Sequence, residues 1–135
     1  MLTYYQSNRL INFNFGNTSY IVPDNFYIGL SSQDPGAEGI NALEPAGGGY
    51  ARVQYGIGTS YWTESTLGIL ENSNDISFPK TTSTWGNITH IFLADSSIKG
   101  NILYYDTLPF SVHVESDSII KLLAGDIKFT LLVTS

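Results

Sequence analysis

The chain has 135 residues, a length typical of one compact domain, and 42% of them are hydrophobic while only 13% are charged. Globular proteins average roughly 25% charged residues, so this deficit favours a surface that is covered in an oligomer or a larger particle. The net charge of −6, without any basic cluster, argues against nucleic-acid binding. Because the chain has no cysteine, it can form neither a disulfide nor a thiolate site.

The N-terminal residues do not have the pattern of a targeting segment. Residues 1–9 lack a basic stretch followed by an apolar one, and the longest apolar runs elsewhere span only a few residues. We therefore expect no signal peptide, no membrane span, and folding in the cytoplasm. The whole chain, residues 1–135, is expected to form a single domain.

A helix is predicted at the N-terminus, over residues 1–16. Its larger residues recur at three- and four-residue steps, and Gly16 is placed to end it. The residues in this pattern are Leu2, Tyr5, Arg9 or Leu10, and Phe13. In the chain as a whole, Asn, Ser, Thr, Tyr, Ile and Gly outnumber Ala, Glu and Lys, which favours strands and turns.

The rest of the chain predicts about eight short strands. They are residues 26–31, 50–55, 75–79, 86–95, 101–106, 110–114, 118–123 and 127–133, with an irregular excursion or short hairpin over 56–74. The links at residues 96–100 and 124–126 contain glycine and favour turns. Short strands at this spacing predict a mostly β fold, an antiparallel β-sandwich (jelly-roll-like) over residues 26–135 with a short N-terminal helix.

Residues 32–49 form the longest predicted loop. The proline and glycine residues of this segment, such as those at 34–36 and 47–49, are too frequent for a helix or strand. The three consecutive glycines precede a strand and lack the Lys and Ser or Thr of a phosphate-binding loop. They are better explained by φ values or close chain approaches that a side chain would forbid. A loop of this length in a small domain is usually a functional or interaction element.

Five residues form a candidate interaction surface. Asp34, Glu38 and Glu44 share the long loop, but their spacing does not match an EF-hand and solvated loop acids are far commoner than calcium sites. We therefore predict no metal site. Tyr61 and Trp62 are expected to be exposed, where their rings could stack on sugars or anchor a protein interface.

The two histidines do not indicate catalysis. His90 and His113 fall in predicted strands, and neither is accompanied by a second histidine or a suitably spaced set of carboxylates. A packing or hydrogen-bonding role is expected for the Thr89-His90 pair. The chain has no Gly-x-Ser-x-Gly elbow. We predict neither an enzyme nor a cofactor.

Nine short segments occur in a recognisable order along nearly the whole chain. They are 8–17 (NRLINFNFGN), 27–30 (YIGL), 34–36 (DPG), 47–52 (GGGYAR), 76–79 (ISFP), 85–90 (WGNITH), 94–95 (AD), 100–104 (GNILY) and 124–127 (AGDI). In order and spacing they resemble a family of small phage virion proteins usually labelled tail fibre proteins. No single segment is specific, and the ordered set carries the resemblance.

The resemblance implies a place in a phage particle. By the family pattern it also implies that Trp85 lies in the core or in a turn scaffold. It does not distinguish the tail, the baseplate and the capsid surface. The chain departs from the family at residues 62–70, and again at residues 111–115, where the family's common Lys is missing.

We therefore expect a non-catalytic virion component, assembled in the host cytoplasm, that forms a small homo-oligomer with a trimer favoured. The helix and the aromatic-bearing loops would bury apolar surface against sister subunits, leaving residues 32–49 free to contact other virion proteins. A tail fibre or tail-associated module is the favoured role. The alternatives are a capsid decoration or head-fibre protein, and a lectin-like module that recognises host surface glycans. Neither nucleic acid nor membrane is an expected partner.

Overall fold

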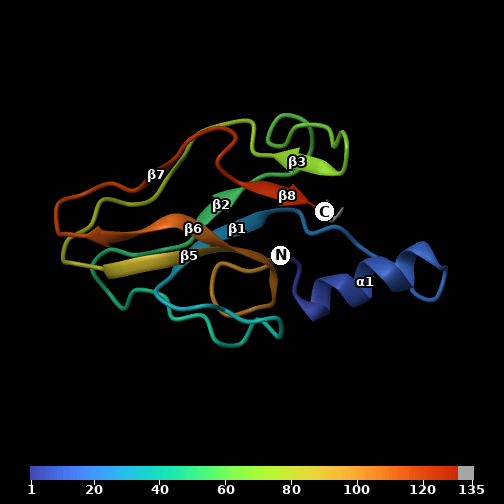
Figure 1. Cartoon of the computed structure of the whole chain (residues 1–135), viewed down its shortest axis with the longest axis horizontal. Helices are drawn as coiled ribbons and strands as arrows, with labels where there is room; N and C mark the ends of the chain where they lie inside the picture. Colours follow the sequence, from blue (N-terminus) through green and yellow to red (C-terminus); the bar gives the residue numbers. More distant parts are fainter. Residues whose placement is uncertain (131–135) are drawn as a thin grey trace.

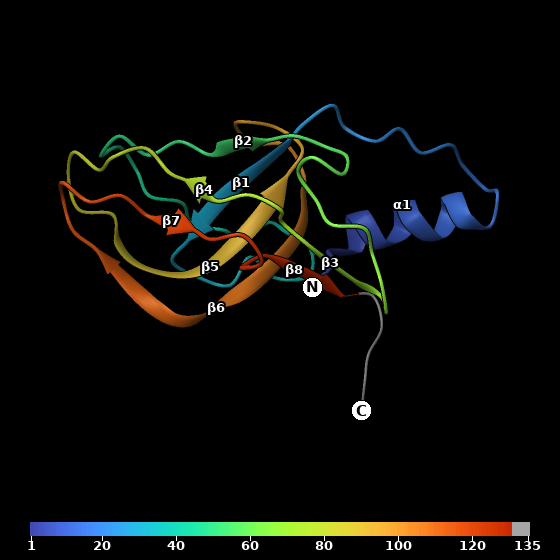
Figure 2. The same cartoon turned by 90° about the horizontal axis from the view of Figure 1, so that it is seen from above.

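The computed structural model describes residues 1–130, which form one helix and eight strands. They are α1 (Tyr4–Asn14), β1 (Phe26–Ser31), β2 (Val53–Tyr55), β3 (Ile69–Glu71), β4 (Ile76–Ser77), β5 (Gly86–Ala94), β6 (Ile102–Val114), β7 (Lys121–Leu122) and β8 (Lys128–Thr130). Four strands pair antiparallel in the order β2-β1-β5-β6, and two separate antiparallel ribbons are formed by β3 with β8 and by β4 with β7. Figures 1 and 2 show α1 projecting from one end of this β-rich body. The predicted mostly β antiparallel fold with a short N-terminal helix is confirmed.

The edge strand β6 is longer than the sequence pattern predicts. The strands expected over residues 101–106 and 110–114 form one continuous strand that runs through Pro109. Because β6 lies at the edge of the four-stranded sheet, the missing N–H of this proline need not leave a neighbouring carbonyl without a partner. A proline that would interrupt a central strand is therefore tolerated here.

One of the two C-terminal strands is shorter than expected. The strand predicted over residues 118–123 is reduced to the two residues of β7, which pair with β4. Pairing decides this length, because a strand lasts only as long as a partner is beside it. The strand predicted over 127–133 is observed as β8, and residues 131–133 lie outside the described residues.

The main core lies between the four-stranded sheet and the two ribbons, which form the two layers of the sandwich. The sheet contributes Ile28 and Leu30 of β1, and the ribbons contribute Ile76 of β4 and Leu122 of β7. All four side chains are buried. Removing this apolar surface from water is the main force that holds the layers together.

A β-bulge adjusts strand β5 to this core. The register of β5 against β6 shifts between Ile88 and His90. Side chains normally alternate between faces, so residues five positions apart would face opposite ways. The shift brings Ile88 and Leu93 into the same buried cluster.

A smaller apolar cluster covers the opposite face of the sheet. Its largest member is Phe92 of β5, which is 2% exposed and lies against Gly29 of β1. A Cβ atom added to Gly29 would lie within van der Waals radii of the Phe92 ring. Ala42 of the long loop packs on this cluster from outside. The loop therefore forms part of the body.

The long loop is irregular, as predicted, but it is packed along its length. Pro35 is fully buried, and the carbonyl of Leu43 accepts a hydrogen bond of 2.9 Å from the backbone N–H of Ser32. At the far end, the indole N–H of Trp85 donates to the carbonyl of Gly48 at 2.8 Å. The expected burial of Trp85 is confirmed.

The three glycines at the end of this loop have the backbone role that the sequence predicts. Gly47, Gly48 and Gly49 all have positive φ angles, of 72°, 62° and 79°. At Gly48 an added Cβ would also meet the Trp85 ring at 3.0 Å. Both a left-handed backbone and a close approach therefore require glycine here.

Candidate interaction surfaces

The most prominent feature outside the body is a segment that we call the arm, residues 4–23. It consists of α1 and the extended segment that returns from the end of α1 toward β1 (Figure 1). Gly16 has a φ angle of 76° and follows the last turn, and the N–H of Asn17 reaches back to the carbonyl of Asn12 at 2.8 Å. The predicted helix end at this glycine is confirmed.

The root of the arm is anchored on strand β6. Thr3 is fully buried, caps α1 by accepting a hydrogen bond from the N–H of Gln6, and donates to the carbonyl of Ile102 at 2.7 Å. The N–H of Tyr4 donates to the carbonyl of Ala37 at 2.8 Å. The body therefore fixes where α1 begins and in which direction it leaves.

The returning segment is held against α1 by aromatic contacts. The guanidinium of Arg9 lies 4.5 Å from the ring centroid of Tyr20 and 5.1 Å from that of Tyr5. Arg9 also donates to the carbonyl of Ile21 at 3.3 Å. The rings of Phe13 and Tyr20 are 6.1 Å apart. The arm is thus a two-layered element with internal contacts of its own.

Most of the arm's apolar side chains are nevertheless exposed. Among the residues of α1, Gln6 alone is buried. The exposed large side chains are Tyr4, Tyr5, Ile11, Phe13, Phe15, Ile21 and Val22, with Phe15 and Ile21 exposed by 79% and 81%. An isolated helix of this length is marginal in water, and clustered exposed apolar side chains mark surfaces that a partner covers.

A groove of about 580 Å³, which we call the arm groove, lies between the root of the arm and the body. Its lining is mostly apolar. Gln6, Leu10 and Val22 line it from the arm, and Leu2, Phe26 and residues 57–59, 62–65, 68, 70, 93, 103, 104 and 129 line it from the body. Gln6 is 8% exposed, and its Oε1 atom has no hydrogen-bond partner among the described residues. The groove therefore combines apolar walls with one buried acceptor.

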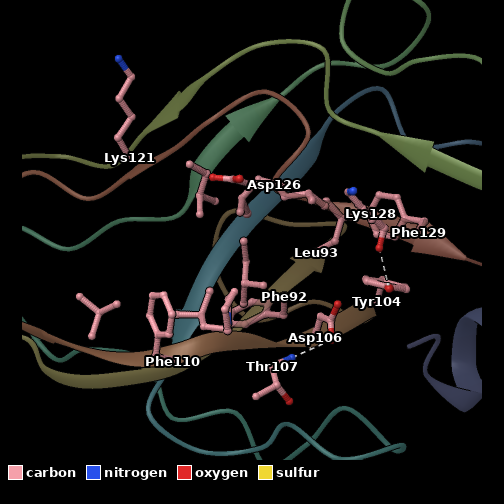
Figure 3. A pocket seen from close by; sticks show the side chains of 17 residues that line it. Phe92, Leu93, Tyr104, Asp106, Thr107, Phe110, Lys121, Asp126, Lys128 and Phe129 are labelled. Atoms are coloured by element: carbon pink, nitrogen blue, oxygen red, sulfur yellow. Dashed lines mark hydrogen bonds between the residues drawn. The ribbon is translucent and has the colours of Figure 1, made fainter.

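A second pocket, of about 380 Å³, lies between the middle of β6 and residues 121–129 (Figure 3). Phe110 and Asp106 extend from β6, and Asp126 and Lys128 lie on the opposing segment (Figure 3). The Phe110 ring is 77% exposed. In such a pocket the ring can stack on a sugar, and the carboxylates and the ammonium group can hydrogen-bond its hydroxyls.

One wall of this pocket is held by a buried tyrosine. The hydroxyl of Tyr104 donates to the carbonyl of Lys128 at 2.8 Å (Figure 3). Burial, assisted by the charge of Asp106, raises the pKa of Tyr104 to about 12. The hydroxyl therefore remains a neutral donor at physiological pH.

Of the three candidate acids in the long loop, Glu44 is held in a network. Its carboxylate accepts hydrogen bonds from Arg52 at 2.9 and 3.0 Å and from the hydroxyl of Tyr50 at 2.6 Å. Burial acts to raise the pKa of Glu44, but the hydrogen bonds from Arg52 and Tyr50 and the charge of Arg52 hold it below its ordinary value. For Tyr50, burial and the hydrogen bond to Glu44 raise the pKa of the phenol.

Arg52 extends this network across the covered face of the sheet. Its guanidinium lies 5.1 Å from the Phe92 ring centroid and donates to the carbonyls of Ser96 and Lys99 at 2.7 and 2.8 Å. The side chain is 6% exposed. Glu44 is therefore a structural anchor of the loop, held by a bidentate pair.

The other two acids of the long loop lie at the surface. Asp34 accepts a hydrogen bond of 2.8 Å from the N–H of Gly36, which stabilises a turn, and Glu38 is exposed. The structure does not gather them with Glu44, since no group of three potential metal ligands occurs within residues 1–130. A role of Asp34 and Glu38 in an interaction remains a prediction.

The expected exposure of Trp62 is wrong. This side chain is 6% exposed, its indole N–H donates to the carbonyl of Gly56 at 2.9 Å, and its ring lies edge-on to Tyr55 at 5.0 Å. Trp62 was expected at the surface because the irregular stretch around it lacks a strand pattern, but irregular backbone can still direct a side chain inward. Tyr61 is 40% exposed and packs edge-on against Tyr55 at 5.1 Å.

Both histidines make local hydrogen bonds. His90 lies 2.8 Å from the hydroxyl of Thr89 and 3.3 Å from that of Thr107, which confirms the expected hydrogen-bonding role. His113 lies 2.8 Å from Asn87 and 3.0 Å from the carboxylate of Glu115. These contacts hold strand side chains in place.

Sequence reasoning missed the arm groove and the pocket of Figure 3. Each is lined by segments far apart in the chain, such as Leu10 with Phe129, or Asp106 with Asp126. The sequence offers one signal that the arm differs from the body, namely the distribution of charge. Among residues 1–23 the only charged side chain is Arg9, whereas the remaining residues carry all twelve acids.

The comparison with protein families identifies the chain. A family model described as Podophage GP4 fiber I protein gp80 matches residues 1–130. The chain belongs to this family of podophage fibre proteins. A comparison with curated proteins finds no match.

The family membership confirms the resemblance inferred from the ordered segments. It makes this chain a bacteriophage virion protein and a structural fibre component. In the described part of the chain, no helix is both long and apolar enough to cross a membrane.

Proposed function

We propose that this fibre protein is a non-catalytic subunit that self-associates into a small homo-oligomer, with a trimer favoured. It would be assembled in the host cytoplasm and attached to other proteins of the phage tail. The observation that carries the proposal is the arm, which projects from the body (Figure 2). Its apolar side chains are exposed. A monomer would keep this surface in water, whereas a sister subunit could cover it.

The test compares oligomeric state in two matched variants. Ile11 and Ile21 are exposed on the arm, and Ile98 is 74% exposed on the turn between β5 and β6. We expect native mass spectrometry to show a trimer for the wild type and for Ile98→Glu, and a monomer for the Ile11→Glu/Ile21→Glu variant. A wild-type monomer at high protein concentration would overturn the proposal.

The position in the particle requires a separate experiment. Immunogold labelling of intact phage with an antibody against this chain is expected to mark the tail. Label spread over the head would instead identify a capsid decoration or head-fibre protein, which is the alternative placement.

A second candidate function is recognition of host surface glycans. The pocket of Figure 3 favours it, because the exposed Phe110 ring and the carboxylates of Asp106 and Asp126 line the same pocket. We expect saturable binding of the purified protein to host envelopes, lost in Phe110→Ala and retained in Phe15→Ala. Equal binding by both variants would exclude this pocket as the glycan site.

A further inference from the structure

The arm groove and the arm have complementary properties. The arm exposes apolar side chains such as Phe15, and the groove offers about 580 Å³ of mostly apolar space. An association that removes both apolar surfaces from water is favoured by the hydrophobic effect.

Charge favours the same pairing. Residues 1–23 carry one positive side chain, Arg9, and no acid, whereas residues 24–135 hold five bases and twelve acids, a net charge of −7. Glu64 lies on the wall of the groove. Two bodies of this charge repel each other, but an arm with its single cation is attracted to a neighbouring body.

The arm also supplies suitable donors. Asn8, Asn12, Asn14 and Asn17 lie on α1 or directly after it, and each side-chain amide carries two N–H donors. A partner of this composition can fill an apolar groove and still donate a hydrogen bond to an acceptor on its wall, such as Glu64. A strongly charged partner could not do so without burying charge.

We propose that the arm groove of each subunit binds the arm of a second copy of this chain. This inference rests on the proposed self-association and names the surfaces that carry it. Arm and groove are different patches, so the contact is heterologous, and it closes into a ring when each subunit gives its arm to the next one. A cyclic trimer formed in this way uses every arm and fills every groove.

The absence of cysteine allows a direct test. Phe15→Cys places a single thiol on the arm, and Ser65→Cys places one on the wall of the groove. The two variants, carrying different tags, are co-expressed and treated with a short bis-maleimide. We expect a cross-linked species that contains both tags. Ser116→Cys is the matched control, because this exposed serine lies in the turn after β6 and does not line the groove.

A second variant tests the groove without a cross-link. Ile57 lines the groove and is 41% exposed, so Ile57→Glu places a carboxylate where the neighbouring arm would pack. We expect the dissociation constant of the oligomer to rise by about tenfold or more, because a charge without a partner would be buried. Ile98→Glu, outside the groove, is expected to leave the dissociation constant unchanged.

The outcomes separate this inference from the proposed function. An oligomer that forms without the Phe15–Ser65 cross-link, and that tolerates Ile57→Glu, would overturn the arm-in-groove contact and leave self-association intact. The groove would then have an occupant other than the arm. A protein that remains monomeric would overturn both proposals.

Discussion

The long loop and the arm reverse the usual relation between regular structure and packing. Residues 32–49 contain no helix or strand, yet Pro35 is fully buried and Glu44 is held by Arg52. The arm contains the only helix of the described residues, yet most of its apolar side chains are exposed. Regular backbone hydrogen bonding therefore does not show where the folding free energy of this chain is gained.

The difference separates two kinds of surface. The loop completes the fold of a single subunit, because it covers Phe92 and the second face of the sheet. The arm contributes little to that fold beyond its root at Thr3. We therefore expect changes under the loop to affect unfolding, and changes on the arm to affect assembly.

The largest expected loss of stability comes from removing the ring of Phe92, which lies under the loop. Phe92→Ala leaves a cavity between the sheet and the loop and should lower the free energy of unfolding by about 3–5 kcal/mol. Chemical denaturation followed by tryptophan fluorescence measures this. Phe110→Ala, which removes an exposed ring from the same sheet, should change it by less than about 0.5 kcal/mol. Similar losses in both variants would contradict the assignment of a second core.

The next effect concerns the anchor of the loop. Arg52→Ala removes the ion pair with Glu44 and the hydrogen bonds to the carbonyls of Ser96 and Lys99, and it leaves the half-buried carboxylate with the hydroxyl of Tyr50 but no cation. We expect a loss of about 3 kcal/mol and new protease cleavage within residues 32–49. Lys80→Ala is the control, since its ion pair with Asp117 is exposed and should contribute less than about 1 kcal/mol.

A smaller loss of folding stability is expected at acidic pH. The pKa of Glu44 is lower in the folded chain than its ordinary value of 4.5, so folding favours the ionised carboxylate. Its contribution to stability is fully present above that ordinary pKa and is lost as the pH falls through the folded pKa. Denaturation curves between pH 6 and 3 should therefore show a steeper loss for the wild type than for Glu44→Gln. Identical slopes would mean that the network does not stabilise the loop.

The smallest expected effect on unfolding comes from the arm. In dilute monomeric protein, Ile11→Glu/Ile21→Glu should change the free energy of unfolding by no more than about 0.5 kcal/mol, because both side chains are already in water. The same variant is expected to lose the oligomer. A large loss of monomer stability would show that the arm, like the long loop, is part of the core of a single subunit.

Periodicity and turn chemistry determined much of the local structure. Aromatic and β-branched residues after a polar loop predict β1 at residues 26–31. Gly16 marks the end of the helix because only glycine adopts a positive φ without cost. The ordered segments were sufficient to recognise a phage fibre family, since they cover nearly the whole chain. These properties depend on neighbours in sequence, and the sequence displays them directly.

Tertiary structure alone decided which residues lie inside and which surfaces are available. Trp62 is buried and Phe110 is exposed, although Trp62 lies in an irregular stretch and Phe110 in a strand. The bulge that places Ile88 and Leu93 on one face depends on the partner strand β6, and the arm groove forms only when Leu10 and Phe129 line the same space. Burial is a property of segments brought together from distant parts of the chain, so no local pattern contains it.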